Sequence, residues 1–114
     1  MALTATTRRF SFRSVHSLNT GAHQEKVHGH QYFLEVSFKD IAHADLAAKV
    51  EQTVLSRLHG HDLTEFAGPA TGEILVEWIH ERLSEVLPTQ ILAVALQETR
   101  KNRFVSARSD RRWI

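Results

Sequence analysis

The chain has 114 residues, of which 42% are hydrophobic, and its formal net charge is +1. This length predicts one domain spanning residues 1–114, and the small net charge argues against nucleic acid as a partner. No apolar run is long enough to cross a membrane. The lack of cysteine excludes disulfides and thiolate sites. The N-terminus lacks the apolar stretch of a secretory signal, so we expect a cytoplasmic protein.

Two strands are predicted near the N-terminus. The first, over residues 9–16, places Phe10, Phe12 and His16 at positions of the same parity. The second, over residues 28–38, alternates polar residues with Tyr32, Leu34, Val36 and Phe38. Alternation with a period of two is typical of a strand that buries one face. We expect the two strands to pair as a hairpin.

Two amphipathic helices are predicted next. The first covers residues 42–58, with Gly60 as its stop signal, and the second is capped by Thr71 and ends before Pro88. Both repeat apolar residues at helical spacing. These residues are Leu46, Val50, Val54, Leu55 and Leu58 in the first helix, and Leu75, Trp78, Ile79, Leu83 and Val86 in the second.

Two further strands complete the pattern. Residues 91–96 are continuously apolar, as in a buried strand, and residues 103–108 resemble an edge strand. The order of elements predicts an α+β fold: a four-stranded antiparallel sheet with two helices on one face. Such a sheet has two open edges, which a barrel built from several subunits would close.

Three histidines form a candidate metal site. His28 and His30 are two residues apart in a predicted strand, so they project to the same face. The hairpin would bring His16 across from them. Three imidazoles with an open fourth position are typical of catalytic zinc. The other interpretation is that these are ordinary polar positions at a strand end, in a chain with eight histidines.

Four motifs in this order resemble the 6-pyruvoyl tetrahydropterin synthase and 6-carboxytetrahydropterin synthase family. Residues 12–18 resemble F-x-A-A-H-x-L, residues 28–30 match H-G-H, residues 69–73 resemble the P-T-x-E helix start, and Glu98-Thr99 matches E-T. The resemblance extends roughly from Phe10 to Ala107. It implies a tunnelling fold, in which three subunits form a barrel and two barrels stack as a hexamer.

The resemblance also implies a site and a substrate. Zinc would bind His16, His28 and His30. Glu98 and Thr99 would bind a pterin, and Glu98 would also take part in catalysis. Glu98 shares parity with Leu92, Val94 and Leu96, which predicts that it continues a buried face. A carboxylate can pair with the adjacent N–H and amino groups of a pterin through two parallel hydrogen bonds. The alternative is that Glu98 ends its strand in water.

The chain departs from the family at the usual proton-transfer residues. The cysteine position of the carboxytetrahydropterin branch is Gln24, and that of the pyruvoyl branch is Ala22. The family segment L-D-H-x-x-L corresponds to Leu58-His59-Gly60-His61-Asp62-Leu63. A branch that cleaves the pterin side chain for folate synthesis has E-x-x-H-G-H, which residues 25–30 match. Glu25 is therefore a candidate base, against the alternative of a solvated loop carboxylate.

Two other groups are weaker candidates. His61 lies one residue from the family histidine and could reach the site, but His59 and His61 could equally be surface loop residues. The C-terminal cations could meet the triphosphate of a substrate or form a solvated tail. They are Arg100, Lys101, Arg103, Arg108, Arg111 and Arg112.

The resemblance predicts a zinc-dependent lyase similar to 6-carboxytetrahydropterin synthase, the enzyme of queuosine biosynthesis. Its substrate would be dihydroneopterin triphosphate or a related dihydropterin. One alternative is cleavage of the side chain to 6-hydroxymethyl-dihydropterin with Glu25 as base. The other is a pterin- or zinc-binding protein without catalysis, which the missing cysteine and Asp-His pair favour.

Overall fold

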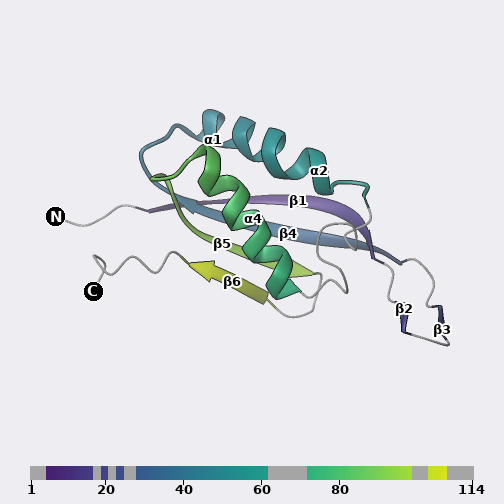
Figure 1. The fold of residues 1–114 in the computed structure, drawn as a ribbon. Helices are drawn as coiled ribbons and strands as arrows, with labels where there is room; N and C mark the ends of the chain where they lie inside the picture. The colour runs from purple at the N-terminus through teal and green to yellow at the C-terminus, as the bar shows by residue number, and fades with distance from the viewer. Residues whose placement is uncertain are drawn as a thin grey trace.

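One antiparallel sheet organises the computed structural model, with strand order β1-β4-β5-β6 (Figure 1). The strands are β1 (Thr6–His16), β4 (His28–Phe38), β5 (Ile91–Glu98) and β6 (Arg103–Ala107). The edge position predicted for the last strand is confirmed, because β6 and β1 are the outer strands. The predicted α+β fold with a four-stranded sheet is likewise confirmed.

The structure describes residues 5–16, 19–20, 23–24, 28–61, 72–98 and 103–107, of which 15–16, 19–20, 23–24 and 28–30 are described by their backbone alone. In the helices described, none is long and apolar enough to cross a membrane.

The first two long strands pair along their whole length, from Thr6 opposite Phe38 to His16 opposite His28. The predicted hairpin is therefore confirmed. It continues into a small second sheet that the sequence did not predict, formed by β2 (Asn19–Thr20) and β3 (His23–Gln24). Gln24, which the resemblance aligns with a cysteine, lies in β3.

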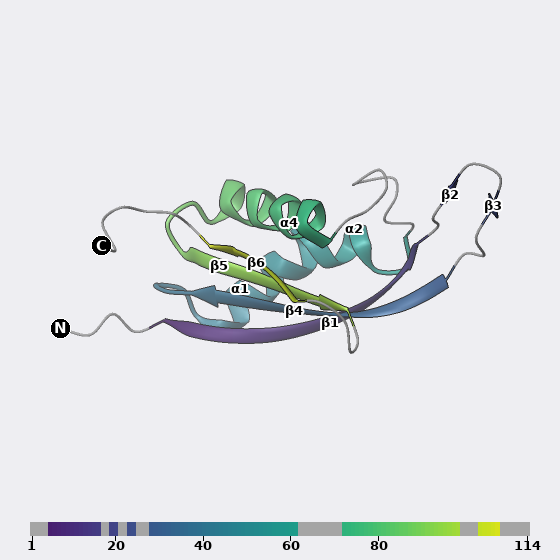
Figure 2. The same cartoon turned by 90° about the horizontal axis from the view of Figure 1, so that it is seen from below.

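The helices lie on one side of the sheet (Figure 2). The first helical run is continuous and consists of α1 (His43–Val50), the π-helical turn η1 (Glu51–Leu55) and α2 (Ser56–Leu58). The second helix is α4 (Gly72–Val86), which packs on β5 and β6. Both predicted helices are thus present. The cap predicted at Thr71 lies outside the described residues.

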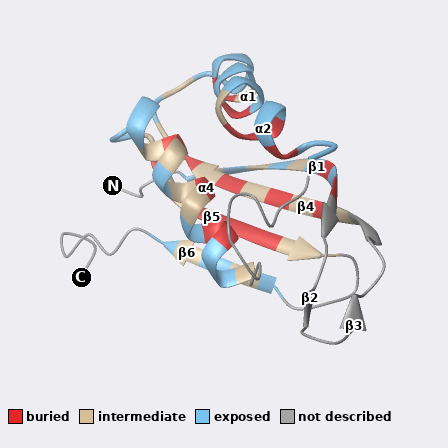
Figure 3. Ribbon diagram, turned by 45° about the vertical axis from the view of Figure 1, so that its right-hand side comes forward, coloured by how far each residue is buried: buried red, intermediate tan, exposed pale blue. Residues whose placement is uncertain are grey.

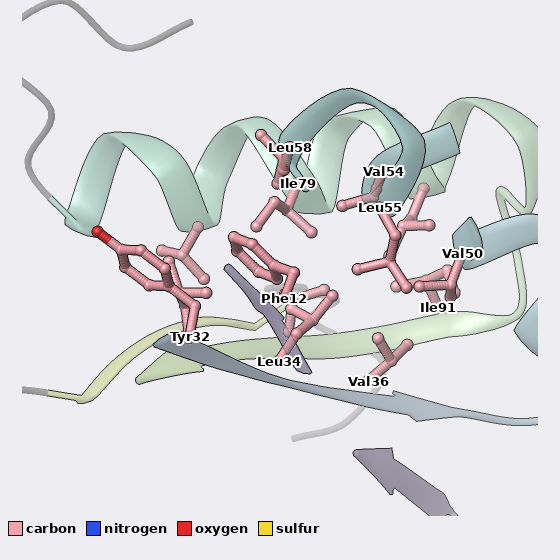
Figure 4. Packing of buried hydrophobic residues seen from close by; sticks show 14 of the residues in the cluster. Phe12, Tyr32, Leu34, Val36, Val50, Val54, Leu55, Leu58, Ile79 and Ile91 are labelled. Atoms are coloured by element: carbon pink, nitrogen blue, oxygen red, sulfur yellow. The ribbon is translucent and has the colours of Figure 1, made fainter. Parts of the chain in front are cut away.

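The core fills the space between the helices and one face of the sheet (Figure 4). Figure 3 shows buried residues along β4 and β5 and exposed ones on the outer sides of the helices. All the core positions predicted on β4 and on the first helical run are buried. They are Tyr32, Leu34, Val36, Phe38, Leu46, Val50, Val54, Leu55 and Leu58.

Two details of the predicted apolar stripes are wrong. Val86 is 43% exposed, whereas Leu87 is buried, because Leu87 lies one helical step of four residues beyond Leu83. In β5, Ile91 is buried and Leu92 only partly so, because a register irregularity between Ser37 and Phe38 shifts the pairing there. Beyond it Val94 and Leu96 are buried as predicted.

Candidate active site

The backbone positions of the three histidines lie at one end of the β1–β4 pair. His16 is the register partner of His28, and His30 is the partner of Ser14. Directly opposite residues of antiparallel strands have Cβ atoms about 4.5–5.5 Å apart. The backbone therefore brings the three positions together, although their side chains lie outside the described part of the structure.

This donor set fits zinc. Three imidazole ligands leave one coordination position open, as in catalytic zinc sites. The chain has no cysteine to compete as a ligand. Among the side chains that the structure describes, no other cluster of three or more histidine or acidic residues could hold a metal ion. The end of the β1–β4 pair is therefore a candidate position for a metal ion.

A row of three residues crosses the sheet two positions inward from His30. Phe12 on β1 is opposite Tyr32 on β4, which is opposite Glu98 on β5. The rings of Phe12 and Tyr32 stack with their centroids 5.1 Å apart. Two residues along a strand span about 6.6 Å, and one strand spacing is about 4.8 Å. Glu98 therefore lies about 8 Å from His30 along the sheet, and His28 and His16 lie farther from it.

Tyr32 is 7% exposed, and in Figure 4 its hydroxyl points away from Leu34 and Val36. Burial of the phenol and, to a smaller extent, the negative charge of Glu98 raise the pKa of Tyr32 to about 12. The phenol therefore keeps its proton at neutral pH and is a hydrogen-bond donor beside the carboxylate. Sequence reasoning missed Tyr32 as a site residue, although its parity with His28 and His30 indicated the shared face.

Glu98 itself is partly buried. The register confirms the prediction that Glu98 continues the face of Val94 and Leu96. The Glu98 side chain is less buried than those of Val94 and Leu96, because the strand ends at Glu98. A partly exposed carboxylate remains accessible to a ligand. Thr99, the other predicted substrate-binding residue, lies outside the described residues.

A tight turn follows α2 and carries the two loop histidines. His59 has φ −65° and ψ 121°, Gly60 has φ +76°, and the His61 N–H donates to the Leu58 carbonyl over 3.2 Å. These are the dihedrals and the hydrogen bond of a type II turn, which needs glycine at its third position. The His59-Gly60 segment therefore builds a defined turn.

The turn is bonded to β1. The Arg13 N–H donates to Nδ1 of His59 over 3.2 Å, and the Gly60 N–H donates to the Arg13 carbonyl over 2.6 Å. The buried hydroxyl of Ser14 donates to the Leu58 carbonyl. Both histidines are exposed. The turn thus lies beside Ser14, the register partner of His30. The sequence did not reveal this position of the turn.

Arg103 does not share the face of Glu98. It pairs with Gln97, the neighbour of Glu98, so it projects to the other side of the sheet. There its guanidinium binds the Glu35 carboxylate at 2.7 Å, and this hydrogen bond lowers the pKa of Glu35. The suggestion that Arg103 meets a substrate triphosphate is therefore not favoured. The other five C-terminal cations, and Glu25, lie outside the described residues.

Comparison with known proteins identifies the family. Residues 5–109 match the family model of 6-pyruvoyl tetrahydropterin synthase. The chain belongs to the 6-pyruvoyl tetrahydropterin synthase family. A search of curated proteins gave no significant match.

Solved structures of this family have the same fold. The Caenorhabditis elegans 6-pyruvoyl tetrahydropterin synthase is 22% identical, with a TM-score of 0.80 over 96% of this chain and 98% of its own. The Plasmodium falciparum 6-pyruvoyl tetrahydropterin synthase is 16% identical, with a TM-score of 0.61 over 91% and 98% of the two chains. At these identities the likeness shows the tunnelling fold of the subunit.

Proposed function

We propose that this chain is a zinc-dependent lyase that cleaves the side chain of dihydroneopterin triphosphate or a related dihydropterin. The observation that carries the proposal is the placement of Glu98 and the three histidines at one end of the same sheet. A pterin anchored at Glu98 would direct its side chain toward the histidines. Family membership supports a pterin as the substrate.

Glu98 would bind the edge of the pterin through two parallel hydrogen bonds to its ring N–H and amino group. The phenol of Tyr32 lies beside this carboxylate, and its proton would orient it. When bound at His16, His28 and His30, zinc would supply a Lewis acid for the side-chain oxygens. These roles separate the recognition of the ring from the chemistry of the side chain.

Because the chain has no thiol, we assign proton transfer to a carboxylate and an imidazole. In a retro-aldol cleavage Glu25 would accept the proton of a side-chain hydroxyl while that carbon becomes a carbonyl and the C–C bond breaks. The electron pair would pass to the carbon attached to the ring, which His61 would then protonate, giving 6-hydroxymethyl-dihydropterin and an aldehyde that carries the rest of the side chain. Proton transfer of this kind contributes typically ~10²–10⁴-fold to the rate.

The match of Glu25 to E-x-x-H-G-H, together with the missing cysteine, favours 6-hydroxymethyl-dihydropterin as an alternative product to 6-carboxytetrahydropterin. We expect the zinc-loaded protein to turn over dihydroneopterin triphosphate and the metal-free protein to show no turnover. Tight binding of the pterin without turnover would indicate instead a binding protein of this family.

Replacing Glu98 by glutamine should weaken pterin binding by about 2–4 kcal/mol, because a charged bidentate contact is replaced by a mismatched amide. Zinc content should stay unchanged. Titration calorimetry with neopterin measures the effect, and Glu35→Gln on the opposite face of the sheet is the matched control. If Glu98→Gln and the parent bind neopterin with equal affinity, Glu98 does not bind the pterin and only ends the strand.

We further propose that the subunit assembles in multiples of three, as a trimer or as a hexamer of two stacked trimers. Among the described strands β1 and β6 are the outer ones. Except at Arg13, which bonds to the turn after α2, their outward backbone groups could pair with other subunits. Light scattering should give a mass that is a multiple of three times 13.0 kDa. A monomer at micromolar concentration would contradict this assembly.

A further inference from the structure

The turn after α2 occupies the outer edge of β1 as a neighbouring strand would. Among the described strands β1 pairs only with β4, so alternate N–H and C=O groups of β1 face outward. At Arg13 both outward groups are taken, the N–H by the His59 ring and the carbonyl by the Gly60 N–H. The sheet edge is therefore closed at this residue by the turn.

Ser14 fixes the same turn from inside the core. It is 1% exposed and is the one buried polar residue found among the described side chains. Its hydroxyl donates to the Leu58 carbonyl, which also accepts the His61 N–H. A buried hydroxyl that loses its partner costs about 1–3 kcal/mol. The turn is thus held to β1 by three hydrogen bonds, one of them buried.

These contacts give the two loop histidines different roles. Nδ1 of His59 accepts a hydrogen bond from the Arg13 N–H, so this nitrogen carries no proton. The contact holds the His59 ring at the backbone of β1. His61 directly follows the anchored turn and is exposed. Ser14 is the register partner of His30, and Arg13 is three residues, about 10 Å, from His16. The anchored turn therefore places the backbone of His61 near the end of the sheet at which the three histidines lie.

We propose that Ser14, His59 and Gly60 form a latch that positions His61 at the site, so that His61 and not His59 is the imidazole that meets the substrate. The inference rests on the proposed function, in which His61 protonates the cleaved side chain. It adds that His59 is a positioning residue, acting through its Nδ1 hydrogen bond to Arg13. In this proposal His59-Gly60 takes the place of the Asp-His pair of the family segment L-D-H-x-x-L.

His59→Leu removes the acceptor, and His59→Asn retains one because the amide oxygen can take the place of Nδ1. We expect His59→Leu to lower kcat about 10- to 100-fold, since small displacements of catalytic groups have effects of this size. His59→Asn should restore most of the rate. KM should change little, because Glu98 binds the ring. Ser37→Ala, which removes a hydroxyl contact to Thr7 at the other end of the β1–β4 pair, is the control.

The decisive comparison is the double mutant. If the latch acts through His61, His59→Leu should have no further effect in a His61→Ala background, because interacting residues are not additive. Additive losses would overturn the inference and leave the proposed function intact. Inactivity of the zinc-loaded parent would overturn both.

Hydrogen exchange gives a readout that is independent of activity. The amide of Arg13 should be protected in the parent and in His59→Asn, and exposed to exchange in His59→Leu, because its hydrogen bond is lost. Equal protection in all three proteins would show that His59 does not hold β1, and would overturn the latch.

Discussion

Replacing His28 and His30 together by alanine is expected to abolish stoichiometric zinc binding while the protein stays folded. Two of the three imidazoles at the end of the β1–β4 pair would be lost, and a single remaining ligand does not hold zinc at neutral pH. The fold should persist because the buried core is made of apolar residues of the sheet and helices. Metal analysis of the purified protein and circular dichroism measure the two effects.

A control variant removes the same number of imidazoles elsewhere. His43 contacts the ring of Phe38, and His80 bonds to Ser106, so neither lies at the end of the sheet where the metal is expected. The double variant His43→Ala, His80→Ala should retain one zinc per subunit. Full zinc occupancy in His28→Ala, His30→Ala would refute the metal assignment.

Replacing Glu25 by alanine should lower turnover of a dihydropterin by ~10²–10⁴-fold, the usual contribution of a general base. Zinc content and pterin affinity should be unchanged, because the proposed ligands and Glu98 remain. Steady-state kinetics with metal analysis and calorimetry measure these quantities. Glu51→Ala, which removes an exposed carboxylate from η1, is the matched control.

Retention of full activity in Glu25→Ala would place the base elsewhere, and His61→Ala would be the next variant to measure. A second variant, Gln24→Cys, installs a thiol at the position of the family cysteine in β3. It should raise the formation of 6-carboxytetrahydropterin only if the rest of the pocket suits that reaction. If Gln24→Cys forms no more of this product than the parent, side-chain cleavage with Glu25 as the base is favoured.

The strands and helices could be predicted because their apolar residues follow simple periods. Tyr32, Leu34, Val36 and Phe38 alternate along β4, and each is buried. The apolar stripe of the second helix predicts that Val86 is buried, but Leu87 takes that place. Local periodicity does not determine which of two adjacent apolar residues at a helix end packs on the core.

The candidate site was predictable only in part. The spacing of His28 and His30 and the hairpin indicated the cluster, and the register confirms that His16 lies opposite His28. The bonds from His59 to Arg13 and from Arg103 to Glu35 connect residues 46 and 68 positions apart. Such contacts depend on how helices and strands pack, so no sequence pattern revealed them.

The most direct test of the central claim is the identity of the product formed from dihydroneopterin triphosphate by the zinc-loaded protein. Mass spectrometry should show a pterin with a shortened side chain, 6-carboxytetrahydropterin or 6-hydroxymethyl-dihydropterin, and the released fragment in equal amount. Metal-free protein and His28→Ala, His30→Ala should give neither. Recovery of the unchanged substrate from zinc-loaded protein that binds pterin would contradict the assignment as a lyase.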